Sequence, residues 1–335
     1  MRWGFILLSW FAAAAEAQTD TSHHESFSDV RGHYIKRYPD HFWVWPVIKS
    51  RSLSFTSENI ATDDQTRFKP NSRTALGAGF YLFEIAAEIA FSIPESETSI
   101  NQFGESDVRD LQINAIGKFW GFDVYWQRYK GFYLDELNGA TDFSKRADIQ
   151  SNNFGLSGFY AFNRTKFSLR SSYNFSERQM HSGGSWMVIG TVNTFKLQGD
   201  STWGDTSSGS EFLSIRYTTF GLAPGYSYNY IVKKFFVNAT LGLGPAHNWL
   251  YVKTANGADS NSISINTISV IRLGIGYNSD RFFGGVGFSI QSRNLRIEDT
   301  RFSNSTSILK FMAGYRFREV AILKKRAVDL FLPRH

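Results

Sequence analysis

The sequence contains no cysteine and, beyond its first residues, no long apolar run. Without cysteine the fold does not depend on disulfides, even in an oxidising compartment. A cysteine set, an HExxH motif and a calcium-binding loop are all absent from the sequence, so it supports no metal site and no cofactor. The lack of a window of about 20 apolar residues excludes a protein that crosses a membrane by helices.

An excess of one charge is also missing. The chain has 36 Lys and Arg against 30 Asp and Glu, a formal net charge of +6, and the basic residues are spread along it. A basic stripe of the kind that follows a nucleic-acid backbone is not seen. We therefore expect no nucleic-acid partner.

The apolar residues that begin the chain predict export. Arg2 precedes a short apolar core that ends at Ala15, and Ala15-Glu16-Ala17 fits a small-x-small cleavage site. These features predict a signal peptide over 1–17, because the core is too short to span a bilayer. A buried N-terminal helix is the alternative. The polar residues of 18–40 are expected to form a flexible periplasmic leader.

From about residue 42 to 317, runs of about ten residues alternate apolar side chains with small or polar ones, as in 111–119. Period two is the signal of a β-strand with two different faces. In 263–277 the apolar Ile268 and Val270 fall on the opposite face. A β-bulge that shifts the phase would explain this exception.

Two features favour a membrane barrel over a soluble β-sandwich. Aromatic residues occur at the ends of runs, as in the girdles of outer-membrane barrels. The second face is polar and carries charges, which a soluble core could not bury unpaired. The sequence therefore predicts an all-β fold, a single-chain transmembrane antiparallel β-barrel. The predicted lumen charges, candidates for a pore lining or for packed ion pairs, are Glu88, Lys118, Asp123, Arg170, Arg272, Lys310 and Arg316.

Thirteen runs are present, whereas a single-chain bacterial barrel should have an even number of strands. We expect about twelve strands, with fourteen as the alternative, and place the error in 184–230, where 196–218 has the composition of a long loop. Short turns at 120–121, 163–164 and 278–281 are expected on the periplasmic side. The runs lie near 47–58, 73–82, 85–93, 108–119, 122–133, 152–162, 165–177, 184–196, 217–230, 235–252, 262–278, 282–294 and 305–317.

The last run ends the predicted barrel, which covers 41–317. Leu309, Phe311, Ala313, Tyr315 and Phe317 are expected to face lipid, and the residues between them the lumen. The pair Tyr315 and Phe317 resembles the closing signature that the barrel-assembly machinery recognises. A basic tail, 318–335, follows it and is expected in the periplasm, either against the barrel base or as a segment that binds a periplasmic partner.

Several stretches resemble one family. They are Tyr34 to Asp40, Lys69 to Ser72 leading into "ALGAGF", "QRYKGFYL" from Gln127, "NFSERQMHSGGSW" from Asn174, and the closing Gly314 to Phe317. In order and spacing they are similar to an uncharacterised family of Bacteroidetes outer-membrane β-barrels, domain of unknown function four-four-two-one. The resemblance covers about 34–317. It implies a barrel in the outer membrane of a Gram-negative bacterium, bordered by outer-membrane lipid, and it implies no catalytic residue.

One compact polar cluster allows an alternative. It consists of Ser176, Glu177, Arg178, His181 and Ser182. Serine, histidine and a carboxylate together could hydrolyse an acyl bond, as in a membrane phospholipase, if they lay within hydrogen-bond reach. Adjacent residues of a strand face opposite ways, however, so we prefer a polar hairpin stabilised by a Glu177–Arg178 or nearby ion pair.

The sequence therefore predicts location and shape but no specific activity. The lumen charges fit either a channel whose selectivity they set or a barrel filled by paired side chains. We expect an integral outer-membrane barrel, a passive channel or a passage for small molecules, and not an enzyme. The alternatives are a lipid-modifying enzyme and a structural or partner-binding barrel. The openness of the lumen and the oligomeric state are not specified by the sequence.

Overall fold

The computed structural model describes residues 30–39, 41–63, 65–71, 74–82, 85–135, 144–203, 212–255, 259–297 and 300–318. The signal peptide and the basic tail predicted above lie outside these residues, except for Arg318. The strands are β1 (Ile35–Arg37), β2 (His41–Asn59), β3 (Gln65–Lys69), β4 (Thr74–Leu82), β5 (Ile85–Ser92), β6 (Asp107–Ile116), β7 (Trp120–Leu134), β8 (Lys145–Ala161), β9 (Glu177–Gln179), β10 (Gly183–Trp203), β11 (Phe212–Val232), β12 (Phe235–Thr254), β13 (Asp259–Asn278), β14 (Phe282–Ile297) and β15 (Thr300–Arg318). The helices include α3 (Glu97–Phe103) and α4 (Leu169–Tyr173), and residues 30–34 are also helical. No helix among the described residues is long and apolar enough to span a membrane.

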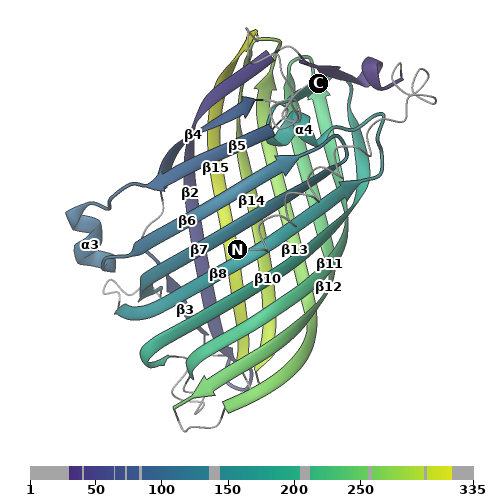
Figure 1. Cartoon of the computed structure of the whole chain (residues 1–335). Helices are drawn as coiled ribbons and strands as arrows, with labels where there is room; N and C mark the ends of the chain where they lie inside the picture. Colours follow the sequence, from purple (N-terminus) through teal and green to yellow (C-terminus); the bar gives the residue numbers. More distant parts are fainter. Residues whose placement is uncertain are drawn as a thin grey trace, which may run out of the picture.

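The strands form a closed antiparallel barrel (Figure 1). Each strand from β7 to β15, apart from β9, pairs with its neighbour in the chain, and β15 pairs back onto β2 from Thr300↔Asn59 to Arg318↔His41. At the other edge β3 pairs with both β2 and β7. This hydrogen-bonded circuit contains ten strands. The predicted transmembrane β-barrel is thus confirmed.

The exact strand count differs from the predicted twelve. The sheet contains 13 strands, because the short β3 forms between β2 and β4. β3 pairs with the second half of β2 and β4 with its first half, so the two occupy successive stretches beside one partner. β5 pairs with β4, and β6 with β7. The three strands outside the ten-strand circuit, β4, β5 and β6, widen the barrel at one end only.

The predicted strand 165–177 does not exist. Its residues fold into the mouth of the barrel as α4 and the start of β9. The Ser168 side chain caps α4 by accepting a hydrogen bond from the Ser171 backbone. Phe167, Leu169 and Phe175 alternate with polar residues because they pack inside the mouth, a pattern that resembles a strand. In 184–230, where the error was expected, β10 and β11 pair almost throughout, and the expected loop 196–218 is largely strand.

The barrel has two different ends. We call the end with the tight turns 117–119, 233–234 and 279–281 the turn end; it also holds 30–38 and 162–182, and it is uppermost in Figure 1. The opposite end, the loop end, holds 60–63 and the segment 93–106 with α3. The turns predicted to share one side, 120–121, 163–164 and 278–281, all lie at or beside the turn end.

The outer surface carries the predicted apolar face. In β15, Phe311 and Phe317 are exposed, whereas Met312 and Arg316 are buried inside, as expected. In β13 the register with β12 is unbroken, so no bulge is present. Ile268 and Val270 instead point inward and join an apolar cluster of the interior.

Outward aromatic pairs ring the turn end. They include Trp186 with Tyr226, Phe235 with Tyr277, Phe282 with Tyr315, and Phe42 with Phe317. Rings of this kind suit the interface between lipid and water. Tyr315 and Phe317 are part of this girdle, and their role as an assembly signature stays a prediction.

The lipid-facing assignment can be tested by one charge placed at two depths of β12. Phe235 lies beside the turn 233–234, and Leu241 is exposed six positions further along. At about 3.3 Å per residue and the usual tilt, that is about 15 Å into the apolar band. We expect Leu241→Arg to lower the free energy of unfolding by about 2–4 kcal/mol and Phe235→Arg by about 1 kcal/mol or less. Equal losses in reversible unfolding from vesicles would contradict the assignment.

Candidate functional site

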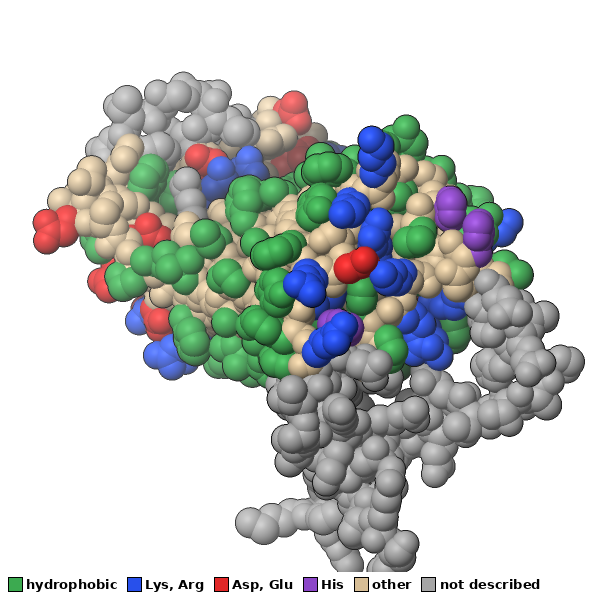
Figure 2. Space-filling model, turned by 90° about the horizontal axis from the view of Figure 1, so that it is seen from above, with side chains coloured by type: hydrophobic (Ala, Val, Ile, Leu, Met, Phe, Trp, Pro, Cys, Tyr) green, Lys and Arg blue, Asp and Glu red, His purple; other side chains and the backbone are tan. Residues whose placement is uncertain are grey.

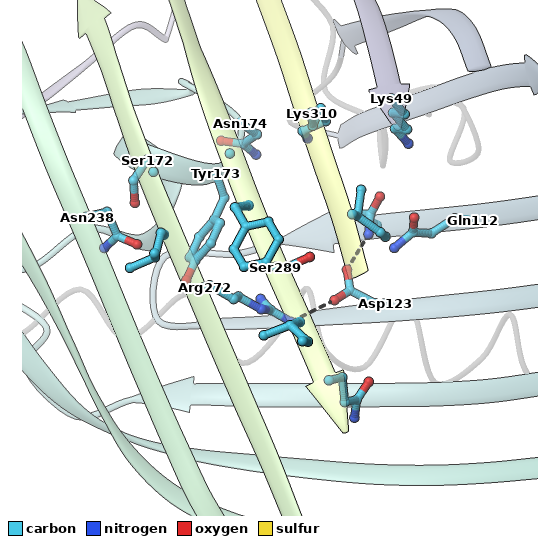
Figure 3. A pocket seen from close by; sticks show the side chains of 18 of the residues that line it. Lys49, Gln112, Asp123, Ser172, Tyr173, Asn174, Asn238, Arg272, Ser289 and Lys310 are labelled. Carbon is cyan, nitrogen blue, oxygen red and sulfur yellow. Dashed lines mark hydrogen bonds and ion pairs between the residues drawn. The ribbon is translucent and has the colours of Figure 1, made fainter. Parts of the chain in front are cut away.

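A chamber of about 210 Å³, lined by charged, polar and apolar side chains, lies in the middle of the barrel. Side chains from opposite walls point into it, among them Gln112, Asp123 and Arg272 (Figure 3). Along β2 the inward residues change from Trp43 and Trp45 at the turn end to Lys49 beside the chamber. Beyond Lys49 comes Arg51, which binds Asp110, and only then the apolar Leu53 and Phe55. The interior is therefore layered, with a polar layer between two apolar ones.

Most charges of the chamber are paired. Glu88 binds Lys49 and lies 3.4 Å from the Lys310 ammonium. Asp123 accepts from Asn114 and lies 3.2 Å from the Arg272 guanidinium. The sequence placed Glu88, Asp123, Arg272 and Lys310 in the lumen, and they lie there. It did not indicate Lys49, because that residue stands in a run of mixed character at the start of the barrel.

The chamber holds more cationic than anionic groups. Lys49, Arg272, Arg293 and Lys310 line it against Glu88 and Asp123, which leaves a formal charge of two positive. Such an excess attracts an anion.

Two buried donors of the chamber are not fully used. Arg293 is 4% exposed; its guanidinium donates to the Tyr125 hydroxyl at 3.2 Å and forms no ion pair within the described residues. Its Nε and the Asn174 amide nitrogen are buried without a hydrogen-bond partner in the described part of the chain. Buried donors without partners are costly, and an anionic ligand would satisfy them. The alternation could not reveal Arg293 as unpaired, because pairing depends on neighbouring strands.

The loop end of the barrel is filled by an apolar cluster. Phe55 is at its centre and stacks on Phe68 at 4.7 Å, with Phe132, Trp203 and Phe302 around it. All these side chains are almost fully buried. The ten-strand circuit at this end explains the filling, because a narrow barrel leaves room for side chains but not for a channel.

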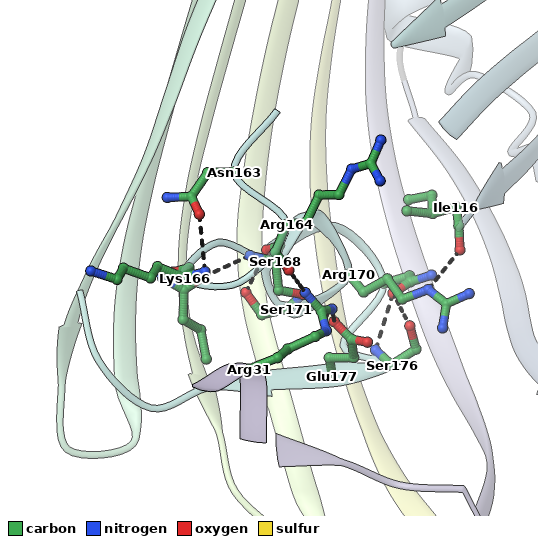
Figure 4. A network of polar contacts seen from close by, with 12 residues as sticks. Arg31, Ile116, Asn163, Arg164, Lys166, Ser168, Arg170, Ser171, Ser176 and Glu177 are labelled. Carbon is green, nitrogen blue, oxygen red and sulfur yellow. Dashed lines mark hydrogen bonds and ion pairs between the residues drawn. The ribbon is translucent and has the colours of Figure 1, made fainter. Parts of the chain in front are cut away.

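The turn end is closed by chain segments that enter the mouth. β1 and β9 form a two-stranded sheet across it. The Arg31 guanidinium reaches the Glu177 carboxylate at 2.7 Å, and the Ser168 hydroxyl donates to the same carboxylate at 2.6 Å (Figure 4). Burial tends to raise the pKa of the Glu177 carboxyl, but Arg31 and Arg170 outweigh it, so the pKa is lowered. The described part of the predicted flexible leader is therefore folded.

The segment 162–182, which closes the turn end, is fixed to the barrel wall on several sides. Arg316 of β15 donates to the Phe175 and Ser279 backbone oxygens and stacks over the Tyr38 ring at 4.2 Å. Asn229 of β11 donates to the Gln179 side chain at 2.7 Å. Arg316, predicted as a lumen charge, is thus buried in the turn-end closure and not in the chamber.

Two other predicted lumen charges also lie at the turn end. Lys118 is in the turn 117–119, and Arg170 is in α4, where its guanidinium donates to the Ile116 carbonyl at 2.9 Å. Burial, together with Arg37, Arg170 and Arg31, lowers the pKa of the Lys118 ammonium. Neither residue reaches Glu88 or Asp123 in the chamber, because Lys118 lies in a turn and Arg170 in a helix rather than in a barrel strand.

The polar cluster of the sequence does not form a hydrolase site. Glu177 binds Arg31, whereas Arg178 lies 3.4 Å from Asp280, so the two residues form ion pairs with other partners and not with each other. His181 stacks on the ring of His33, and within the described residues it has no hydrogen bond to a serine or carboxylate. Ser182 accepts from the Ile231 backbone.

The remaining member of the cluster, Ser176, donates to the Asn174 side chain at 2.7 Å. The cluster as a whole therefore helps to close the barrel. Among the described residues no group of His, Asp and Glu is placed to hold a metal ion.

Lysine and arginine side chains gather on the turn end, as seen from above in Figure 2. Asp280 lies among them and bonds to the Lys36 ammonium at 2.8 Å; that hydrogen bond lowers the pKa of the Asp280 carboxyl. The exposed cations at this end are Lys36, Arg37, Arg164, Lys166, Lys233, Lys234, Arg281 and Arg318.

Comparison with known protein families assigns the chain to one of them. The model of one family, described as a domain of unknown function (DUF4421), matches residues 20–317. The chain belongs to this family. The match begins before β1 and ends in β15, so the family unit includes the barrel and the turn-end closure. No curated protein matches this DUF4421 chain.

Several solved structures have a similar fold. The outer-membrane protease OmpT of Escherichia coli has 11% identity and a TM-score of 0.40, over 83% of this chain and 97% of its own. The translocator domain of the autotransporter NalP from Neisseria meningitidis has 14% identity and a TM-score of 0.37, over 91% and 98%. The β domain of the Bordetella autotransporter BrkA has 11% identity and a TM-score of 0.34, over 84% and 100%.

The turn-end closure of this DUF4421 protein should depend on pH through Glu177. A carboxyl with a lowered pKa stabilises the folded state above its unfolded pKa, and this stabilisation is lost as the pH falls through the folded pKa. We expect hydrogen-exchange protection of the β9 amides to fall below about pH 4. Glu177→Gln should remove this step and weaken protection at neutral pH, because Arg31 would be left buried without its partner.

The matched control is Glu58→Gln, since Glu58 pairs with Arg301 at the loop end. This variant should leave β9 protection and its pH step unchanged. If Glu177→Gln keeps the wild-type pH step, the carboxylate does not hold the closure.

Proposed function

We propose that this protein is a barrel of the Gram-negative outer membrane that binds a small anionic molecule in its chamber and has no permanently open pore. The observation that supports this proposal is the chamber itself, which has a cationic excess and is closed toward both ends of the barrel. The turn end is assigned to the periplasm, because short turns face the periplasm in bacterial barrels.

The closures argue against a passive channel. A channel needs a continuous aqueous path, whereas the Phe55 cluster fills one end and α4 with β9 fills the other. Passage of a molecule therefore requires a movement of the wall or of a closure. A lipid-modifying enzyme has less support, because His181 contacts His33 rather than a nucleophile.

The first test is conductance. Purified protein in planar bilayers should give no stepwise current at moderate voltage. Replacing 163–182 by a short glycine–serine linker, together with Phe55→Ala and Phe302→Ala, should produce steady current, because it removes both closures. The linker alone should stay silent, since the loop-end cluster remains. Steady current from the wild-type protein would contradict the proposal.

The second test is binding of a small anion. We expect butyrate or inorganic phosphate to bind the detergent-solubilised protein after long equilibration, as measured by native mass spectrometry. Arg293→Gln should weaken this binding about tenfold or more, because a hydrogen bond to a charged group is lost. Arg293→Lys, which keeps the charge, should weaken it less. Absence of specific anion binding to the wild-type protein would overturn the proposal.

A further inference from the structure

The barrel wall has one seam. β5 and β6 lie side by side in the wall, but within the described residues no backbone pairing joins them. Among the described residues, the partner of β5 is β4 and the partner of β6 is β7. In the described part of the chain, every other neighbouring pair around the barrel is joined by backbone hydrogen bonds.

An unpaired seam is unusual in a membrane barrel. Lipid offers no hydrogen-bond partners, so each unsatisfied backbone group in the hydrocarbon region costs several kcal/mol, and barrels close to avoid such edges. The seam is therefore a feature that the fold retains at an energetic cost, which points to a functional opening rather than to ordinary wall.

A cavity of about 310 Å³ fills the seam and connects two different environments. Its outer part is lined by Ile89, Phe91, Leu111 and Trp126, all exposed on the lipid-facing surface. Its inner part is lined by polar residues that also line the chamber: Lys49, Glu88 and Gln112. The seam thus runs from the lipid-facing surface to the edge of the chamber.

Ion pairs from β2 stand at the inner mouth of the seam. Lys49 reaches Glu88 on one side of it, and Arg51 reaches Asp110 on the other. Gln127 of β7 donates to the same Asp110 at 2.9 Å. The two strand edges are therefore held by side chains from one strand rather than by each other, and this arrangement allows them to separate without breaking a backbone ladder.

The two cavities together indicate the chemical class of the ligand. An apolar entrance from the membrane suits an acyl chain, and the cationic chamber suits an anionic head group. The cavity of about 310 Å³ is at the lower end of usual ligand-pocket sizes and the chamber of about 210 Å³ is below it, so one chain fits better than several. We infer that the β5–β6 seam is a lateral portal through which a single-chain anionic amphiphile passes between the membrane and the chamber. This inference rests on the proposed function and names its ligand class and route.

Because the chain contains no cysteine, introduced thiols can be modified selectively. Ile89→Cys with Leu111→Cys places one thiol on each side of the seam, and a flexible bifunctional thiol reagent can bridge them. The control pair, Leu241→Cys with Ile271→Cys, joins directly opposed, lipid-facing positions of β12 and β13. The protein is reconstituted in phosphatidylcholine vesicles that contain palmitate with a photoreactive diazirine, and labelled peptides are mapped by mass spectrometry.

We expect label on chamber residues, and we expect bridging the seam to reduce it to the background level of the outer wall. Bridging the control pair should have no effect. Arg293→Gln should reduce chamber label about tenfold and Arg293→Lys less. The phosphate monoester of the same chain distinguishes a phosphate from a carboxylate head group, and stronger labelling by either supports the portal.

Equal chamber labelling by the neutral methyl ester, or undiminished labelling after bridging, would overturn the inference. If butyrate or phosphate binds but the long-chain probe never reaches the chamber, the portal is wrong and the proposed function stands. If no anion binds, both are wrong. Heat-modifiable migration on gels verifies that each variant is folded.

Discussion

The structure depends on the closure of one backbone ladder in an environment without water. β15 pairs with β2 from one end to the other, and this pairing closes the sheet into a barrel. Without it, the backbone groups of both edge strands would face lipid, which offers them no hydrogen-bond partners. The outward apolar face and the aromatic girdle follow from the same constraint, because the surface must match hydrocarbon and its borders. Against this background the unpaired β5–β6 seam is the exception that requires an explanation.

The interior follows from the change in strand number along the axis. At the loop end, β3 joins β2 directly to β7, and the narrow barrel is filled by the Phe55 cluster. Toward the turn end, β4, β5 and β6 are inserted, and the wider barrel holds a polar chamber and then the segment 162–182. The chamber, its closures and the seam therefore share one cause, which is the interruption of the strand beside β2.

Period two was enough to predict the outer surface, because lipid imposes the same rule on every strand. It correctly placed Phe311 outside and Lys310 inside. It failed at 165–177, since a segment packed in the barrel mouth alternates for a different reason. The partners Arg31–Glu177 and Lys49–Glu88, and the unpaired Arg293, arise from strand neighbours distant in sequence, so no local pattern could identify them.

The chamber is proposed to be closed toward water at both ends and to be reached from the membrane. The most direct measurement is the reactivity of one thiol in the chamber, Ser289→Cys, which faces it in Figure 3. In vesicles, a bulky charged maleimide added on both sides should leave this thiol unmodified, whereas a membrane-soluble maleimide should modify it. Rapid modification by the charged reagent would show that the chamber is open to water, because it requires an aqueous path along the barrel.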